Sequence, residues 1–353
     1  HSAISQIPNS RIISAPDLLS LCGQLKLPNP ATTQRCSTPE PPTIETDLAD
    51  IAGQDLAKRA LEMSAVGGHH LLMVGPPGAG KTLLASALPG LLPALTEDEM
   101  LDLALIRELA GLPADRRRPF RSPHHATSGA ALIGGGSHAL PGEVSLATHG
   151  VLFLDELPEF PARTLDLLRQ PLEQGRITIN RAKISNTYPA QFQLVSAMNP
   201  CPCGYAGSVD PPCRCRGENI ARYQGRISGP LLDRIDLHVP LERQPSAQLF
   251  STREAPDSSA LVRDRVCQAR QRQIARQGVL NSQLAGKALL QHCAMEAEVR
   301  RWFEAASDRL ALSARSVHRS LRVARTLADL DNQRNVTEPQ LMEALSYRRR
   351  LSD

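Results

Sequence analysis

Eight consecutive residues, Gly75 to Thr82, match the pattern G-x-x-x-x-G-K-[ST] in full. They follow an apolar run that is typical of a buried parallel strand, and the apolar residues after them favour a helix. In this order of strand, loop and helix, backbone N–H groups surround phosphate oxygens, the lysine adds positive charge and the threonine hydroxyl binds Mg²⁺. We therefore predict that ATP and Mg²⁺ are bound by Gly75, Pro76, Pro77, Gly78, Ala79, Gly80, Lys81, Thr82 and Leu83.

A pair of carboxylates, Asp155 and Glu156, ends a second apolar run, Val151 to Leu154. Four apolar residues in a row suit a central parallel strand that is covered on both faces. At the carboxyl end of that strand, Asp155 would bind Mg²⁺ directly or through a water, and Glu156 would polarise the attacking water. An acidic pair at a strand end is a weak signal by itself, but after a phosphate-binding loop it predicts an ATPase.

Asn199 ends a third predicted strand, Leu194 to Met198. In an open parallel sheet, ligands bind outside the carboxyl ends of the strands. Asn199 is therefore placed where it could orient the lytic water beside Glu156. The alternative is an ordinary turn asparagine before Pro200.

Arg234 lies at the corner between a short predicted helix and the last core strand. An arginine at such a corner is expected at the edge of the molecule, where its own phosphate-binding loop is out of reach. It would fit the γ-phosphate of a neighbouring subunit better, as an arginine finger that acts in trans.

Four cysteines form two close pairs on either side of a short loop that is rich in glycine and proline. The pairs are Cys201 with Cys203 and Cys213 with Cys215. Two such pairs fit a tetrahedral Zn²⁺ site of the structural kind. The C-x-C spacing is tighter than the commoner C-x-x-C spacing, so thiols without metal, or redox-active thiols, are the alternative.

The bulk properties of the chain bound the class of protein. The 353 residues, of which 41% are hydrophobic, predict a globular protein of two or three domains. No apolar run approaches the roughly 18 residues of a membrane span, and the first residues are no secretory signal, so we expect a cytoplasmic protein with no membrane contact. In that compartment, cysteines are more often thiols or metal ligands than disulfides. The net charge of +4 is compatible with a nucleic-acid partner without indicating one.

Three regions are predicted along the chain. Residues 1–46 are broken by prolines and are interpreted as the end of an N-terminal domain and a linker. Residues 47–245 form the ATPase core, in which a helix before the phosphate-binding loop either covers the adenine or simply packs. Residues 246–353 show helical apolar spacing throughout, which predicts a helical lid domain. Arg315 lies early in one of its helices and is a candidate site residue.

Two basic segments of the core are candidate interaction surfaces. Residues 116–145 are basic and rich in proline and glycine, so we interpret them as an insertion outside the core. Its residues His124 and His125 are taken as loop histidines, with a metal site as the weaker alternative. Further on, two short predicted strands form a hairpin with Arg181 and Lys183 at or beside its tip.

In these features the sequence resembles the AAA+ ATPases. More narrowly it resembles their Mg-chelatase-like branch, in the group that includes competence proteins. The segments that carry the narrower match are Gly75–Thr82, Phe120–His125, Pro141–Ala147, Gly150–Pro158, Asn199–Gly204 and Arg226–Val239.

The resemblance implies an α/β fold, with a three-layer αβα core around a parallel sheet and a C-terminal all-helical lid. It implies that Lys81, Thr82, Asp155 and Glu156 form the ATP and Mg²⁺ site. It makes Asn199 the first sensor residue, Arg234 the arginine finger and Arg315 the second sensor residue.

The resemblance also implies a function. It is that of a homo-hexameric DNA helicase that promotes branch migration during natural transformation and recombination. In related replicative helicases the corresponding insertion and hairpin touch DNA, which implies that residues 116–145, Arg181 and Lys183 contact branched or single-stranded DNA without reading its sequence. The family carries an N-terminal Lon-protease-like domain, for which residues 1–46 are too short. Two alternatives remain open: a chelatase subunit that drives metal insertion, and an ATP-dependent module that remodels a protein partner.

Overall fold

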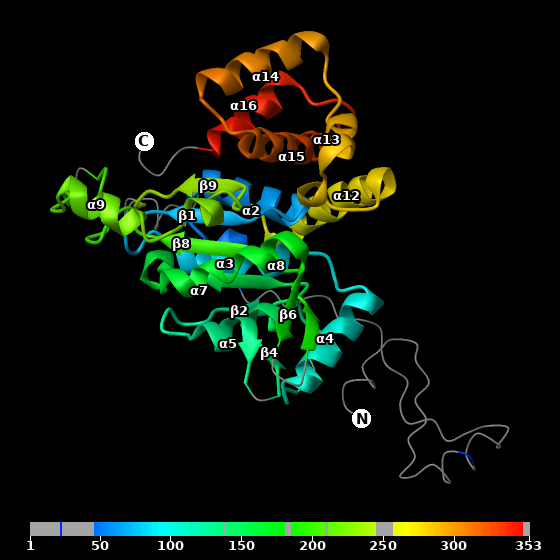
Figure 1. Ribbon diagram of the computed structural model, residues 1–353. Coiled ribbons are helices and arrows are strands. Elements are labelled where there is room, and N and C mark those ends of the chain that lie inside the picture. Colours follow the sequence, from blue (N-terminus) through cyan, green and yellow to red (C-terminus); the bar gives the residue numbers. More distant parts are fainter. Residues whose placement is uncertain are drawn as a thin grey trace.

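The described part of the chain is built on a five-stranded parallel sheet. A computed structural model describes residues 46–113, 115–136, 138–180, 185–208, 211–244 and 257–348, together with Cys22. Every strand pairing in the main sheet is parallel, so the carboxyl ends of its strands meet at one edge. The strand order is β2 (Phe120–Arg121), β5 (Val151–Leu154), β8 (Gln193–Met198), β1 (Leu71–Val74) and β9 (Leu237–Pro240) (Figure 1).

Helices cover both faces of this sheet, which confirms the predicted α/β class. Successive side chains of a strand point to opposite faces, so Leu71 and Met73 lie in one apolar core and Leu72 lies in the other. The first core is closed by α2 (Asp55–Gly67) and α3 (Lys81–Leu91). The second is closed by α5 (Gly129–Ile133), α6 (Glu143–Leu146), η3 (Leu157–Glu159), α7 (Ala162–Asp166), α8 (Arg169–Gln174), α9 (Gly217–Gln224) and α10 (Gly229–Leu232).

Helix α4 (Glu97–Leu109) begins with a reciprocal cap. The Thr96 hydroxyl accepts a hydrogen bond from the Glu99 N–H at 3.2 Å, and the Glu99 carboxylate accepts one from the Thr96 N–H at 2.9 Å. This reciprocal capping satisfies two N–H groups that have no partner inside a helix.

The interpretation of residues 116–145 as an insertion outside the core is wrong for part of the segment. Phe120 and Arg121 form β2, which pairs with β5 as the edge strand of the main sheet. A strand of two residues between Pro119 and Pro123 is too short to show an apolar period, which explains why the sequence did not predict it. The segment also contains the small antiparallel pair β3 (Gly134–Gly135) and β4 (Leu140–Pro141).

The predicted hairpin is confirmed as β6 (Arg176–Asn180) and β7 (Ser185–Pro189). Its tip, with Arg181 and Lys183, lies outside the described residues. The hairpin packs on the 116–145 segment, since the Tyr188 hydroxyl donates to the Ala139 carbonyl at 2.7 Å. The two predicted interaction surfaces are therefore neighbours.

The C-terminal region is helical, as predicted, and shares the first apolar core through α12 (Ser259–Gln277) and α15 (Ala314–Leu330). In Figure 1 the orange and red helices at the end of the described chain lie past β9 and α2, at the opposite end of the molecule from β2. None of the described helices is both long and apolar enough to cross a bilayer. The elements are α12 (Ser259–Gln277), η4 (Asn281–Gln283), α13 (Gly286–His292), α14 (Ala297–Arg309), α15 (Ala314–Leu330) and α16 (Glu338–Ser346).

A buried polar network joins the helical region to the amino ends of β1 and β9. His69 lies between Asp236, 3.0 Å from its Nδ1, and Thr326, 2.8 Å from its Nε2. Arg319 of α15 donates to the other oxygen of Asp236 at 2.7 Å. Burial opposes the charge of this carboxyl, but Arg319 and His69 hold the pKa of Asp236 well below its usual range. The ion pair therefore fixes α15 against the sheet.

Candidate functional site

The loop between β1 and α3 has the shape of a phosphate cradle. Gly78 and Gly80 have φ values of 77° and 84°, in the left-handed region that favours glycine. No atom outside the immediate chain lies within 4 Å of a Cβ built on either residue, so the side of the loop that they face is open. Gly80 is also the N-cap of α3, whose first N–H groups point into the loop. Backbone donors and an open concave space fit the triphosphate of a nucleotide.

Lys81 is held at this loop by three acceptors. Its Nζ donates to the carbonyls of Gly75 at 2.6 Å and Pro76 at 2.9 Å, and to the Asn199 Oδ1 at 2.9 Å. Burial lowers the pKa of the Lys81 ammonium, while the charges of Asp155 and Glu156 oppose that shift. The predicted sensor Asn199 therefore lies beside the predicted phosphate ligand, although 118 residues separate them in sequence.

The predicted Mg²⁺ ligands also come together. The Thr82 hydroxyl donates to the Asp155 Oδ2 at 3.0 Å, and the other oxygen of Asp155 accepts from the Glu156 N–H at 2.9 Å. Mg²⁺ prefers oxygen ligands and usually binds one or two carboxylates plus phosphates and waters. Thr82 and Asp155 thus fit a magnesium ion at the mouth of the phosphate cradle.

Glu156 contacts a residue that the sequence analysis treated as an ordinary loop histidine. Its Oε2 lies 3.3 Å from the His125 Nδ1, and the His125 ring packs edge-on against Phe160. Glu156 itself has a φ of 51°, a strained backbone conformation for a residue with a side chain. His125 is brought here because it follows β2, which ends beside β5. The signal that would have found it is the assignment of Phe120-Arg121 as a strand.

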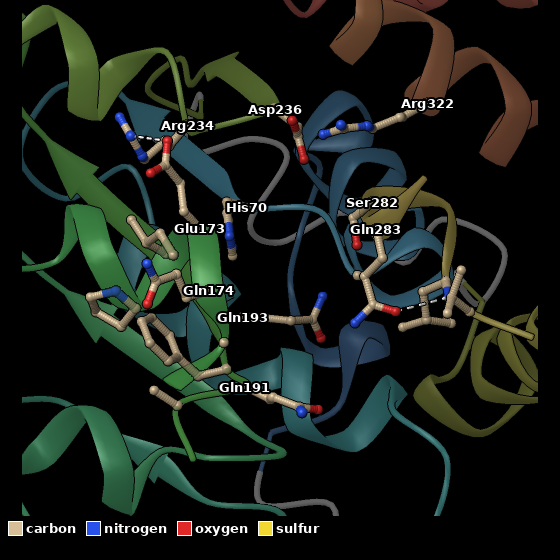
Figure 2. Close-up of a pocket in the computed structure, with 18 of the residues that line it drawn as sticks. His70, Glu173, Gln174, Gln191, Gln193, Arg234, Asp236, Ser282, Gln283 and Arg322 are labelled. Carbon is tan, nitrogen blue, oxygen red and sulfur yellow. Dashed lines mark hydrogen bonds and ion pairs between the residues drawn. The ribbon is translucent and has the colours of Figure 1, made fainter. Parts of the chain in front are cut away.

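Arg234 and Arg315 lie away from the phosphate-binding loop. Both line a pocket of about 720 Å³, which is also lined by His70, Gly150 and Gln193 at the amino ends of β1, β5 and β8. Figure 2 shows His70, Gln193 and Arg234 in this pocket. All five strands are parallel, so their amino ends lie together and their carboxyl ends lie together. The pocket is at the amino ends of the strands, and the phosphate cradle is at their carboxyl ends. Both arginines therefore lie across the sheet from the phosphate-binding loop of their own chain.

The Arg234 side chain is less exposed than its predicted position at the edge suggests, since 8% of the residue is accessible. Its guanidinium donates to the Pro230 carbonyl at 2.5 Å and forms an ion pair with Glu173 (Figure 2). The buried Nε has no hydrogen-bond partner in the described part of the chain. Glu173 is half exposed, so the arginine is covered by a side chain that can move away.

The four predicted zinc ligands form one cluster. All four sulfur atoms lie within 4.8 Å of one another, and Cys201, Cys203 and Cys213 are 3.3–3.7 Å apart. A tetrahedral site with Zn–S bonds of about 2.3 Å places its sulfurs about 3.8 Å apart. The N–H groups of Arg214 and Tyr205 lower the pKa of the Cys203 thiol to about 6, which favours the thiolate that metals bind, whereas burial and the neighbouring thiols raise the pKa of Cys213 and Cys215. The cluster fits a metal ion of the zinc type.

Two family profiles match most of the chain. The profile described as magnesium chelatase, subunit ChlI, matches residues 47–249. The profile described as magnesium chelatase, subunit ChlI C-terminal, matches residues 256–348.

Similar curated proteins are longer than this chain. It is 49% identical over 310 residues to the uncharacterized protein YifB of Escherichia coli K12, which covers 86% of this chain and 61% of YifB. It is 47% identical over 307 residues to the competence protein ComM of Haemophilus influenzae, covering 86% of this chain and 60% of ComM. A more distant similarity, 28% identity over 199 residues, joins it to the magnesium-chelatase 67 kDa subunit of Chlorobaculum parvum, over 55% of this chain and 26% of that subunit.

Proposed function

The chain belongs to the magnesium chelatase subunit ChlI family, an AAA+ family, and we propose that it is an ATPase that uses ATP to move DNA strands as a hexameric ring. The observation that supports ATP turnover best is the convergence of Lys81, Thr82, Asp155 and Asn199 at one edge of the sheet. Lys81 and Thr82 follow the loop after β1, Asp155 directly follows β5, and Asn199 directly follows β8. The proposal for the whole protein rests on a chain that spans about 60% of the length of its relatives YifB and ComM.

Each residue of the site has a chemical role in this proposal. Lys81 and the N–H groups of the loop bind the phosphates, and Thr82 with Asp155 holds Mg²⁺, which neutralises charge on the phosphate oxygens. Glu156 orients a water and accepts its proton. Asn199 holds Lys81 in place and lies where it can orient the same water.

The opposed positions of the cradle and the arginines support a ring. An arginine at the far edge of one subunit reaches a nucleotide only if it is bound by the next subunit, in a head-to-tail contact. Contacts of this kind close into rings when the rotation between subunits allows it. We propose that Arg234 and Arg315 serve the neighbour's site, with Glu173 covering Arg234 in the single subunit.

DNA is the proposed partner, and its support comes from two sources. A relative at 47% identity is named a competence protein. The hairpin β6–β7, whose tip sequence is basic, packs on the 116–145 segment, so one surface combines the two elements that the resemblance assigns to DNA.

We predict that changing Arg181 and Lys183 to Ala lowers DNA affinity about equally for different sequences. Basic side chains on phosphates supply affinity and little base information, so the salt slope of binding should fall by roughly 1 for each phosphate that is no longer neutralised. Unwinding should fall far more than basal ATP turnover. Fluorescence anisotropy at several salt concentrations, with a strand-displacement assay, measures both effects.

The matched control is the double variant Arg300→Ala, Arg301→Ala, which removes two exposed arginines from α14 in the helical region. It has the same change in net charge, and we expect its salt slope to stay close to that of the wild type. If the hairpin variant keeps the wild-type slope and displaces strands normally, the DNA path does not pass over this tip.

A chelatase role is the second candidate, because the matching family profile and the distant relative both carry that description. The two candidates differ in what stimulates ATP turnover. We expect forked, single-stranded or four-way DNA to raise the steady-state ATPase rate of the purified protein. An unchanged rate with all three DNAs, together with stimulation by tetrapyrrole-binding partner subunits, would favour the chelatase role.

We further propose that the cysteine cluster binds one Zn²⁺ per chain. Thiolate ligation of this kind supplies folding energy to the segment that carries the ligands. We expect elemental analysis of protein purified without chelators to find about one equivalent of zinc, and a Cys203→Ser, Cys213→Ser variant to contain almost none. Wild-type protein without stoichiometric metal would contradict the assignment.

A further inference from the structure

The loop that carries the four cysteines touches the phosphate-binding loop. A Cβ built on Gly204, between the two cysteine pairs, would lie 2.5 Å from the Pro77 Cδ, a distance at which one of the two groups must shift. Pro77 is part of the phosphate cradle. The backbone of Gly204 therefore packs directly on this loop, and its φ of +89° makes glycine the residue that fits both the conformation and the space.

The same loop begins at the sensor residue. Asn199, which accepts a hydrogen bond from Lys81, is followed after one residue by the first cysteine of the cluster. From the C-terminal end of α9, which follows the loop, the Gln224 side chain donates to the Pro200 carbonyl at 3.0 Å. The cluster thus stands between two contacts with the phosphate site, through Pro77 and through Asn199.

Few side chains in the described part of this loop are buried. In the described residues 200–216, only Cys201 and Gly204 are buried, so the segment has no apolar core of its own. Backbone N–H groups of the loop also point to the sulfurs, among them those of Ala206, 3.2 Å from the Cys201 Sγ, and Cys215, 3.4 Å from the Cys213 Sγ. A metal bound at such a site stabilises the fold of the segment around it.

From this arrangement we infer that the metal in the cysteine cluster braces the phosphate cradle. The inference rests on the proposed zinc binding and gives that zinc a role in ATP affinity. With the metal bound, the loop keeps Gly204 against Pro77 and Asn199 beside Lys81, so the cradle is held in its binding shape before the nucleotide arrives. Loss of the metal lets the loop move, and the nucleotide must then order both loops when it binds, which lowers its affinity.

Two glycines of this loop provide a test that leaves the metal ligands intact. Gly204 and Gly207 both have positive φ, +89° and +80°, so alanine introduces similar backbone strain at either position. They differ in surroundings, because a Cβ at Gly207 would meet nothing within 4 Å, whereas one at Gly204 would meet Pro77. Gly207→Ala is therefore the matched control for Gly204→Ala.

The affinity for the non-hydrolysable ATP analogue AMP-PNP with Mg²⁺ is measured by calorimetry, and zinc content by elemental analysis. We expect both glycine variants to keep about one zinc. Gly204→Ala should weaken AMP-PNP binding by roughly tenfold, the loss expected for a moderate change in packing at the cradle, and Gly207→Ala should stay within about twofold of the wild type. Equal affinities for the two variants would overturn the brace.

A second pair of variants removes the metal itself. Cys203→Ser, Cys213→Ser should lose the zinc and bind AMP-PNP roughly tenfold more weakly, while Cys267→Ser on α12, outside the cluster, should keep both. Adding Gly204→Ala to the metal-free variant should weaken binding little further, since both changes act on the same packing of Gly204 against Pro77.

The outcomes separate the inference from the proposals on which it rests. Wild-type protein without zinc contradicts the metal assignment, and wild-type protein that does not bind AMP-PNP contradicts the ATPase. A zinc-free variant that binds AMP-PNP as tightly as the zinc-loaded wild type overturns the brace alone.

Discussion

Glu156→Gln should bind ATP with nearly wild-type affinity and hydrolyse it at a rate lower by about 10²–10⁴-fold, the usual contribution of a positioned general base. The amide keeps the size of the side chain but cannot accept the proton of the attacking water. Lys81, Thr82 and Asp155, which bind the phosphates and Mg²⁺ in our proposal, are untouched by this change. Single-turnover hydrolysis and calorimetry with ATP measure the two quantities separately.

The companion variant Lys81→Ala should differ from Glu156→Gln in its ATP affinity. It removes a charge that binds the phosphates and that becomes more important as charge develops on the γ-phosphoryl group, so both ATP affinity and turnover should fall. The matched control for Glu156→Gln is Glu159→Gln. Glu159 lies on η3 near the site and pairs with Arg226 at the surface. A Glu156→Gln protein that hydrolyses ATP normally would remove Glu156 from the mechanism.

The second large effect is expected for Arg234→Ala. Loss of an arginine finger lowers kcat by about 10³–10⁵-fold where it has been dissected. The structure supports an action in trans, because Arg234 and the phosphate cradle occupy opposite edges of the sheet. Removing the arginine leaves Glu173 without its partner, but that carboxylate is half exposed, so we expect the fold to tolerate the change.

Mixing two inactive proteins tests the trans arrangement directly. An Arg234→Ala subunit keeps an intact phosphate cradle, and a Lys81→Ala subunit keeps an intact arginine. A complete site forms where the cradle of an Arg234→Ala subunit faces the arginine of a Lys81→Ala subunit. After random mixing of equal amounts this is about one interface in four, and ATP turnover should return there. Assembly is followed by light scattering on the same mixtures, and a variant with both changes in one chain is the control that should restore nothing. Intact mixed assemblies without any recovered turnover would contradict action in trans.

Much of the candidate site could be predicted because its signals are local in sequence. The pattern from Gly75 to Thr82 combines residue types and spacing that only a phosphate-binding loop requires, and its flanking apolar runs identify the strand and the helix. Asp155 and Asn199 follow apolar runs in the same way. Parallel strands end at a common edge, so these signals together also predicted that the three segments meet.

Other parts of the site carry no local signal. The two-residue strand Phe120–Arg121 is too short for an apolar period, and without that strand the sequence could not place His125 beside Glu156. The contact of Gly204 with Pro77 joins residues that are distant in sequence. A glycine is compatible with any turn, and only its neighbours in space show why a larger residue would not fit.

The motifs could be recognised from the order of the residues alone: a phosphate-binding loop, a carboxylate pair, a polar strand end, and four thiols at metal-ligand spacing. Which of these residues lie together became clear only from the arrangement of the strands and loops. The tertiary structure placed Asn199 on Lys81, put Arg234 and Arg315 at the far edge of the sheet with Glu173 over Arg234, and set the cysteine loop against the cradle. Strand and loop propensities act over a few residues, whereas the end of the sheet at which an arginine lies depends on the order and direction of all five strands.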